Sequence, residues 1–404
     1  MRIAHVTDVY LPRLGGVELQ VHDLASRQRS IGHEPIVVTT TPAPSLTEAD
    51  GLARQFAHVP VVRLGDGALA AGPYRGVSHR ELAHVLDGFG IDAVHVHLST
   101  FSPLSWSAAR LSVRTGRPTV VSVHSMWNDV LPLVRGYARW HGARTWPVTW
   151  AAVSTAAAAA VQEALDGAPV SVLPNGIDPD AWRRPSARRS GDVPTLVSVS
   201  RMVRRKRPRA LLHTLLELRA ARRFRAVLVG DGPLVPALRR DVAAAGAGAD
   251  ITLTGALDRP AIRDLLAGAD LYLAPALRES FGIAALEARS AGLPVLARSG
   301  SGVGDFVAHG VEGWLAGSED EFRAAIAGLL ADPARLRAAA AHNRAVPPRI
   351  AWGSVLAAAD QLYDRAAAPR RAGSPQAQGP SGQGPRGQGP RGRDPRTPLA
   401  GAGR

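Results

Sequence analysis

The chain has 404 residues, with 48 lysine and arginine residues, 34 aspartate and glutamate residues and no cysteine. Because 46% of its residues are hydrophobic and 20% are charged, it can bury a core, which excludes a wholly disordered protein. The lack of cysteine excludes a disulfide scaffold, an iron–sulfur site and a thiol nucleophile. The first residues show no signal-peptide pattern and no long apolar run occurs, so we expect a cytoplasmic protein without a membrane-spanning helix.

Much of the net charge of +14 lies at the carboxyl end of the chain. Residues 366–404 contain seven arginines and one aspartate, a balance of +6, together with nine glycines and seven prolines. Such a segment has too little apolar surface to offset the entropy of ordering it, so we predict a disordered tail over residues 367–404. Its arginines could bind nucleic acid or acidic lipid, but a solvated extension without a specific partner is the favoured interpretation.

In the first half of the chain, short β-rich runs alternate with amphipathic helical runs. This alternation is typical of parallel sheets built from βαβ units. The predicted strands cover residues 2–8, 35–40, 93–98, 119–124, 148–154 and 170–174. The segment 46–74 has no clear period, and we predict loops with one short strand there.

A second series of strands follows a stretch rich in proline and arginine at 180–194, which we interpret as a linker. Its predicted strands cover residues 195–200, 226–230, 251–254, 271–274 and 295–297. A final helical period follows near 352–363. The expected fold is therefore α/β, with two doubly wound Rossmann-like domains at 1–178 and 179–348 facing a central cleft, and a terminal helix at 349–366.

The only lysine in the chain, Lys206, lies in the loop predicted after the first strand of the second domain, together with Arg201. In a doubly wound sheet this loop is where a phosphate binds. A guanidinium and an ammonium could together neutralise a diphosphate. The alternative is an exposed basic loop, because further arginines crowd the same stretch.

Two glutamates flank the start of another predicted helix. Glu279 lies in the strand-to-helix loop and Glu287 lies eight residues later, about two turns along the helix. Carboxylates accept hydrogen bonds from sugar hydroxyls, and a helix N-terminus suits phosphate. By spacing alone, however, two surface glutamates would be the commoner explanation.

Taken in chain order, these loops form part of a longer set of motifs. The set comprises Gly15-Gly16-Val17-Glu18, Gly32-His33-Glu34, His95-Val96-His97, Val123-His124, Leu173-Pro174-Asn175-Gly176-Ile177-Asp178, Arg201 with Lys206, Gly230-Asp231-Gly232-Pro233, and Glu279 to Ile283 with Glu287. In this ordered set the chain resembles the retaining glycosyltransferases of family 4, which have the GT-B fold. The resemblance covers roughly residues 1–365.

The resemblance implies catalytic roles for four residues. Arg201 and Lys206 would hold the diphosphate of a nucleotide-sugar donor and stabilise it as the leaving group. Glu279 would lie at the donor sugar, and His124 would contact the transferred sugar near the reaction centre. Ser200 and Arg207 depart from the family pattern, which has glycine at both positions, but no charged group is lost.

The resemblance also implies a set of donor contacts. Glu287 would bind the ribose, and the loop with Gly255 and Leu257 would hold the base. Gly16 would approach the diphosphate from across the cleft. Three residues would offer backbone N–H groups to sugar or phosphate, namely Phe281, Gly282 and Ile283.

Two other patterns leave alternatives open. Asp178-Pro179-Asp180 matches a metal-binding D-x-D motif, but the resemblance gives this junction a structural role. His95 and His97 lie on one face of a strand and could ligate zinc. Because no third ligand appears at a recognisable spacing, a structural or acceptor-side role is favoured for them.

Four of the eight tryptophans lie at 127, 140, 146 and 150, interleaved with arginines. Such a stretch could lie on an anionic membrane, although core packing is the favoured interpretation. Peripheral contact with the inner face of a membrane is therefore an open alternative, as is a membrane-associated acceptor.

The sequence thus predicts a hexosyltransferase that uses a UDP- or GDP-linked sugar, retains stereochemistry and needs neither cofactor nor metal. The acceptor and the oligomeric state stay open, and no specific nucleic acid is expected. Two alternatives are an arginine-rich nucleic-acid-binding protein without catalysis and a sugar-nucleotide epimerase of the GT-B fold.

Overall fold

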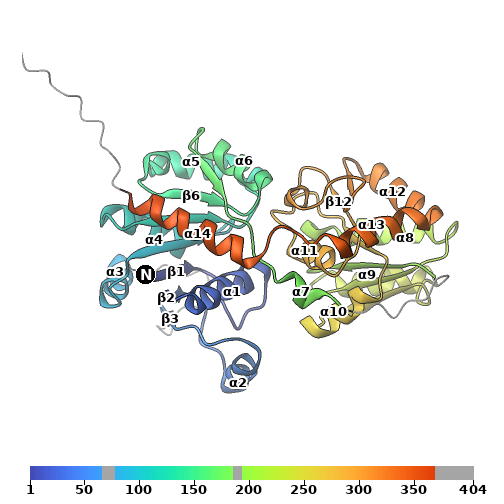
Figure 1. The fold of residues 1–404 in the computed structure, drawn as a ribbon, viewed down its shortest axis with the longest axis horizontal. Helices are drawn as coiled ribbons and strands as arrows, with labels where there is room; N and C mark the ends of the chain where they lie inside the picture. Colours follow the sequence, from blue (N-terminus) through green and yellow to red (C-terminus); the bar gives the residue numbers. More distant parts are fainter. Residues whose placement is uncertain (66–77, 185–192, 369–404) are drawn as a thin grey trace, which may run out of the picture. The chain divides into compact units, whose positions relative to one another are not determined.

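A computed structural model describes residues 1–65, 78–184 and 193–368. Within them the chain forms two parallel sheets with flanking helices, one sheet from each half (Figure 1). The prediction of two doubly wound α/β domains is therefore confirmed. Most of the predicted linker and the predicted disordered tail from Pro369 onward lie outside the described residues.

The first sheet has seven strands in the order β3-β2-β1-β4-β5-β6-β7. Its strands are β1 (Arg2–Thr7), β2 (Glu34–Thr39), β3 (Val61–Arg63), β4 (Ala93–Leu98), β5 (Thr119–Val123), β6 (Thr149–Ala152) and β7 (Val170–Val172). The strand order reverses between β1 and β4, so the loops that follow these two strands diverge and leave a crevice at the carboxyl edge of the sheet.

Helices of the first half connect these strands. They are α1 (Gly16–Ser30), α2 (Leu46–Gln55), α3 (His79–Gly88), α4 (Pro103–Arg114), α5 (Leu131–Trp140) and α6 (Thr155–Ala164), with the single turn α7 (Pro179–Trp182) leading to the second half.

The prediction of loops and one strand over 46–74 is wrong in one respect, because helix α2 lies there. A capping box starts this helix: Ser45 Oγ accepts from the Glu48 N–H at 3.3 Å, and the Glu48 carboxylate accepts from the Ser45 N–H at 2.8 Å. The Ser-x-x-Glu spacing that signals such a box was present in the sequence.

The second sheet has six strands in the order β10-β9-β8-β11-β12-β13. Its strands are β8 (Thr195–Val199), β9 (Arg225–Val229), β10 (Ile251–Gly255), β11 (Leu271–Ala274), β12 (Val295–Arg298) and β13 (Gly313–Ala316). The strand β13 was not predicted, because it begins with glycine, which weakens a strand pattern. That glycine is required by a close approach: a Cβ on Gly313 would lie 2.0 Å from the carbonyl oxygen of Val295.

Six helices pack around the second sheet. They are α8 (Pro208–Leu218), α9 (Val235–Ala244), α10 (Arg259–Ala267), α11 (Ile283–Ser290), α12 (Glu319–Ala331) and α13 (Pro333–Ala345).

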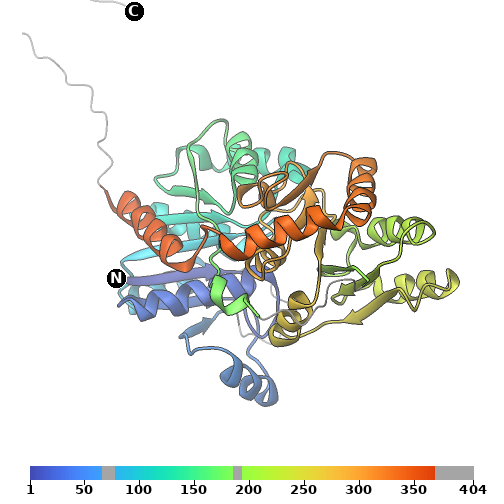
Figure 2. The same cartoon turned by 45° about the vertical axis from the view of Figure 1, so that its right-hand side comes forward.

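The last helix, α14 (Trp352–Ala367), follows the second half in sequence but packs on the first sheet (Figures 1 and 2). Its buried face includes Trp352, Val355, Leu362 and Tyr363 and joins a core cluster with residues of β1, β4, β5 and β6. The chain therefore crosses between the two halves twice.

Candidate functional site

The predicted donor residues lie at the carboxyl edge of the second sheet, where the strand order reverses between β8 and β11. The loop after β8 carries Arg201 and Lys206, and the loop after β11 carries Glu279. Such a reversal point is where ligands bind in open α/β sheets.

Two glycines in the loop after β9 hold the loop after β8 in place. A Cβ on Gly230 would lie 1.9 Å from the Ser200 carbonyl oxygen, and one on Gly232 would lie 2.7 Å from that of Met202. The Met202 N–H donates to the Asp231 carbonyl oxygen at 2.8 Å. The Gly230-Asp231-Gly232 motif therefore positions the basic loop, which carries Arg201 and Lys206.

The two loops at the reversal point are joined by an ion pair. The Lys206 ammonium contacts the Glu279 carboxylate, and only 19% and 18% of these side chains are exposed. Arg201 lies on the same loop as Lys206 and is exposed, and no ion pair engages it among the described residues. The structure thus brings two of the predicted catalytic groups into contact.

Helix α11 begins at Ile283 with no side-chain cap. Its N-cap is Gly282, whose φ of 92° lies in the left-handed region that favours glycine. The first N–H groups of a helix have no partner within the helix and carry partial positive charge. Phe281, next to the cap, is 1% exposed and belongs to the core, so only its backbone can face a ligand.

Gly16 at the start of α1 faces the start of α11. A Cβ on Gly16 would lie 3.3 Å from Cδ1 of Ile283. Helix α1 has Gly15 as its N-cap and likewise no side-chain cap. Two helix N-termini, one from each half of the chain, therefore converge near the Lys206–Glu279 pair.

Ser280, the residue after Glu279, links this loop to the first half of the chain. Its hydroxyl donates to the His124 carbonyl oxygen at 2.8 Å, and its own carbonyl accepts from Ser154 Oγ at 2.5 Å. The first of these bonds places His124, directly after β5, beside the loop that carries Glu279. Sequence reasoning quoted Ser280 within a motif but missed Ser154 and the link between the two, because a pairing across 126 positions leaves no local pattern.

Glu287 lines a cavity of about 90 Å³ with charged residues that the sequence analysis did not single out. Burial raises the pKa of this carboxyl to about 7, although Arg259 and Arg263 act to lower it and Asp23 acts to raise it. Arg259 also pairs with Asp23 at 3.3 Å, from α10 to α1. The cavity therefore holds a carboxyl that is poised to ionise near neutral pH.

The predicted base-binding residues, Gly255 and Leu257, lie directly before α10, the helix that carries Arg259 and Arg263. Gly255 has a φ of 77°, and its carbonyl oxygen accepts from the Gly230 N–H at 2.8 Å. This loop is therefore tied to the glycine-rich loop that positions the basic residues.

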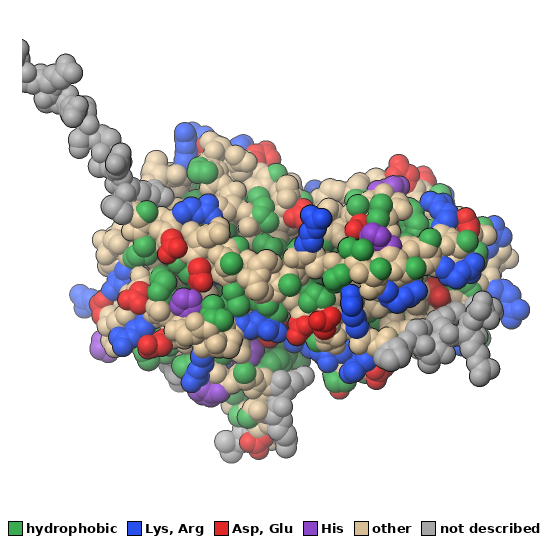
Figure 3. Space-filling view, viewed as in Figure 1, with side chains coloured by type: hydrophobic (Ala, Val, Ile, Leu, Met, Phe, Trp, Pro, Cys, Tyr) green, Lys and Arg blue, Asp and Glu red, His purple; other side chains and the backbone are tan. Residues whose placement is uncertain are grey.

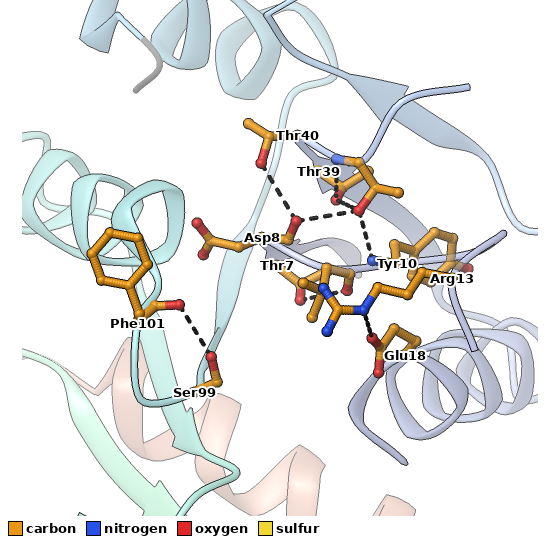
Figure 4. A network of polar contacts seen from close by, with 11 residues as sticks. Thr7, Asp8, Tyr10, Arg13, Glu18, Thr39, Thr40, Ser99 and Phe101 are labelled. Carbon is orange, nitrogen blue, oxygen red and sulfur yellow. Dashed lines mark hydrogen bonds and ion pairs between the residues drawn. The ribbon is translucent and has the colours of Figure 1, made fainter. Parts of the chain in front are cut away.

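At the reversal point of the first sheet, the main-chain carbonyl of Asp8 accepts from the hydroxyls of Thr40 and Thr41 at 3.4 and 3.2 Å (Figure 4). The Asp8 carboxylate accepts from the N–H groups of Leu104 and Ser105 at 2.9 and 3.1 Å, at the start of α4. Burial raises the pKa of Asp8, and these bonds oppose the rise. Nearby, Arg13 pairs with the buried Glu18 at 3.1 Å in the loop and first turn of α1 (Figure 4). Asp8 thus holds α4 against β1.

His95 and His97 lie side by side on β4, with ring centroids 4.3 Å apart, and both are buried. His5 joins them from the neighbouring strand β1, and ring nitrogens of the three lie within 4.8 Å of one another. This third histidine was not recognisable by spacing, because the parallel pairing of β1 with β4 brings it in.

Comparisons with known proteins cover both halves of the chain. The model of the family described as Glycosyltransferase Family 4 matches residues 14–181, and that of Glycosyl transferases group 1 matches residues 180–345.

Similar curated proteins span almost the same length. A GDP-mannose-dependent α-(1-6)-phosphatidylinositol monomannoside mannosyltransferase of Mycobacterium tuberculosis is 30% identical over 367 residues, covering 85% of this chain and 92% of its own length. A D-inositol 3-phosphate glycosyltransferase of Thermobispora bispora is 28% identical over 402 residues, covering 87% of this chain and 90% of its own length.

The fold also matches solved structures. A crystal structure of an Anabaena protein in complex with UDP and glucose superposes with a TM-score of 0.72 at 20% identity, covering 90% of this chain and 99% of that one.

One residue of the basic loop carries backbone strain that can be measured. Arg207 has a φ of 56°, in the region that favours glycine, and its guanidinium pairs with Glu319 at 2.6 Å. Arg207→Ala and Arg207→Gly both remove the pair, but only glycine relieves the strain. We expect the glycine variant to exceed the alanine variant in free energy of unfolding by about 1 kcal/mol, measured by urea titration. An alanine variant of equal or greater stability would contradict this.

Proposed function

Since the chain belongs to the family 4 glycosyltransferases of the GT-B fold, enzymes that act on nucleotide sugars, we propose that it transfers a hexosyl group with retention and without a metal ion. We further propose GDP-mannose as the donor and an inositol-containing molecule as the acceptor.

One observation carries the proposed chemistry: Lys206, which shares a loop with Arg201, pairs with Glu279 at the uncapped start of α11. Breaking the bond between the anomeric carbon and the phosphate oxygen concentrates negative charge on the departing diphosphate. An ammonium, a guanidinium and helix N–H groups stabilise that charge. With these cations supplied by the protein, the reaction needs no metal ion.

Retention follows if the acceptor attacks from the face that the diphosphate leaves. The acceptor oxygen then forms its bond to the anomeric carbon as the bond to phosphate breaks. The hydroxyl proton passes to the departing phosphate oxygen, which also keeps the electrons of the broken bond to the anomeric carbon. This step uses no side chain as a base, so Glu279 is left to pair with Lys206 and to contact the sugar.

The names of the relatives support the proposed substrates. The Mycobacterium tuberculosis relative is named for GDP-mannose and for a phosphatidylinositol mannoside, and the Thermobispora relative for inositol 3-phosphate. An Arabidopsis relative, 24% identical, is named as a subunit of a phosphatidylinositol N-acetylglucosaminyltransferase. An inositol unit is common to all three names.

Helix α5 presents a surface that suits peripheral contact with an anionic membrane. Leu133 and Trp140, seven residues apart and hence on one face, are 76% and 87% exposed. Arg139 lies beside Trp140, and the helix contains no acidic residue. The other tryptophans of this stretch, at 127, 146 and 150, are buried in the core. None of the helices that the structure describes has the length and hydropathy to traverse a bilayer.

A basic surface for nucleic acid has less support. On the face shown in Figure 3, lysine and arginine side chains are interspersed with acidic ones rather than gathered into one patch.

The proposed function is tested by incubating the full chain with GDP-mannose or UDP-glucose and a phosphatidylinositol mannoside, with and without EDTA. We expect GDP release with GDP-mannose, EDTA resistance, and a product whose one-bond ¹³C–¹H NMR coupling at the anomeric carbon shows the donor's anomeric configuration. Inversion or loss of activity in EDTA would overturn the proposed chemistry. Formation of an epimeric nucleotide sugar without acceptor would indicate an epimerase. RNA binding that is lost on deleting residues 369–404, together with no donor turnover, would indicate a nucleic-acid-binding protein.

Removing either cation should slow the chemical step. We expect Lys206→Ala and Arg201→Ala each to lower kcat by about 10²-fold, because each removes a donor to the developing charge. Arg205→Ala removes an exposed arginine from the same loop and serves as the matched control, with kcat expected within about twofold of wild type. A wild-type kcat for Lys206→Ala would refute its assigned role.

Donor binding should depend on pH through Glu287. Ribose hydroxyls donate to the ionised carboxylate, so with a pKa near 7 in the free protein the Kd for GDP-mannose should rise as pH falls below this value, by up to about tenfold per unit. The donor's diphosphate diester does not itself titrate in this range. Calorimetry on Glu287→Gln should show a Kd without this dependence. A wild-type Kd that is constant from about pH 5.5 to 8 would rule out this role.

The α5 surface is tested by sedimentation with phosphatidylinositol-containing vesicles. We expect Trp140→Ala to weaken vesicle binding by about fivefold or more, because it removes the largest exposed apolar side chain of the surface. Val311→Ala, at a residue that is 45% exposed in the second half of the chain, is the control and should bind as wild type does. Equal binding by both variants would exclude α5 as the membrane contact.

A further inference from the structure

Next to His124, the first sheet carries a set of buried polar side chains that the proposed chemistry does not use. His5 on β1 and His95 and His97 on β4 share one face of the sheet, where His5 is level with His95 in the strand register. Their exposed fractions are 0%, 0% and 3%. Buried polar groups are costly unless hydrogen-bonded, so their partners decide what they do.

These side chains form a continuous hydrogen-bonded chain that reaches His124. Nε2 of His124 lies 2.9 Å from Nδ1 of His97, and Nε2 of His97 lies 3.0 Å from Nδ1 of His5. Nε2 of His5 then lies 2.6 Å from the side-chain oxygen of Gln28 on α1. The amide nitrogen of Gln28 donates to the hydroxyl of Tyr363 on α14 at 2.8 Å.

The imidazoles of this chain are neutral. Burial lowers the pKa of His5 and of His124 to about 4, although the Gln28 hydrogen bond acts to raise that of His5. Burial, reinforced by the neighbouring histidines, lowers the pKa of His97 well below its usual value. A neutral imidazole has one N–H and one lone pair, so each ring donates at one nitrogen and accepts at the other.

The Gln28 oxygen sets the direction of every bond in the chain. An amide oxygen can only accept, so Nε2 of His5 carries the hydrogen and its Nδ1 accepts. His97 must then donate through Nε2 and accept through Nδ1. His124 must in turn donate through Nε2, which leaves Nδ1 as its lone-pair atom. The 2.6 Å separation supports this amide orientation, because it lies just below the usual N–H···O range and is too short for a contact between two nitrogens.

A branch through Tyr363 agrees with this direction. The Tyr363 hydroxyl accepts from Gln28 and donates to Nδ1 of His95 at 2.8 Å. Nε2 of His95 then donates to Ser122 Oγ at 2.7 Å. Each bond thus has one donor and one acceptor, with no ring charged.

We propose that Gln28, acting through His5 and His97, is a positioning residue that holds His124 in the Nε2–H tautomer, so that Nδ1 accepts a hydrogen bond from a hydroxyl of the transferred sugar. Nδ1 has no partner among the described residues, and His124 is only partly buried. A neutral acceptor suits this position, because an imidazolium would repel the positive charge that develops on the sugar ring. The role toward sugar rests on the proposed function, but the tautomer does not.

A metal ion could compete for the same nitrogens, because His5, His95 and His97 could offer ligand atoms within 4.8 Å of one another. Two observations favour the hydrogen-bonded chain. The rings of His95 and His97 are stacked at 26°, whereas ligands of one ion point toward a common centre. Each of these rings is also hydrogen-bonded at both of its nitrogens.

The tautomer is tested by long-range ¹H–¹⁵N NMR on the full chain labelled with ¹⁵N-histidine, with His124 assigned by His124→Gln. We expect the Nε2–H pattern for His5, His97 and His124 in the absence of any donor. An Nδ1–H pattern for His124, or one equivalent of zinc in the purified protein that removes these N–H signals, would overturn the proposal. Since no substrate is present, this result is independent of the proposed function.

The functional consequence is tested with Gln28→Met, which removes the amide at similar volume, and with Ser122→Ala as the matched control. Ser122 is equally buried but lies at the end of the Tyr363 branch. We expect Gln28→Met to mix the His124 tautomers and to lower kcat about tenfold with little change in donor KM, as for one hydrogen bond lost in the transition state. Ser122→Ala should keep the Nε2–H tautomer of His124 and the wild-type kcat. Unchanged tautomer and kcat in folded Gln28→Met would overturn the proposal.

Discussion

The contact between Lys206 and Glu279 is the constraint on which the site depends, because it ties together the two loops at the reversal point of the second sheet. Each loop is also held in place by residues other than Lys206 and Glu279. Gly230 and Gly232 allow the basic loop to lie against its neighbour, and Ser280 ties the acidic loop to His124 in the first half. In the proposed function, the cations thus meet the donor phosphates from a prearranged position, which lowers the reorganisation cost of charge stabilisation.

Charge is arranged differently around Glu287. There, burial disfavours the carboxylate while Arg259 and Arg263 favour it, so its pKa stays near 7. Arg259 also pairs with Asp23 of the first half at 3.3 Å. The ionisation of Glu287 and the contact between the two halves therefore share one guanidinium, and a donor that binds Glu287 acts on both.

The sequence predicted the elements whose evidence is local. Strand and helix periods indicated both sheets, and motifs at strand ends singled out Lys206, Glu279 and Glu287. What it could not predict depends on pairs that are distant in sequence. Ser154 meets Ser280 across 126 positions, and His5 meets His97 across 92. No period or spacing records such pairs, because they arise only when parallel strands and the two halves come together.

Helix α14 joins these features into one structure. Its first residue, Trp352, lies so close to Gly176 that a Cβ there would come within 2.4 Å of the indole, and its N–H donates to the Ile177 carbonyl oxygen at 3.1 Å. The two crossings between the halves therefore touch. Further along, Tyr363 contacts Gln28 and completes the buried histidine chain. A helix that follows the second half of the chain in sequence thus supplies both a link between the halves and the hydroxyl that accepts from the Gln28 amide.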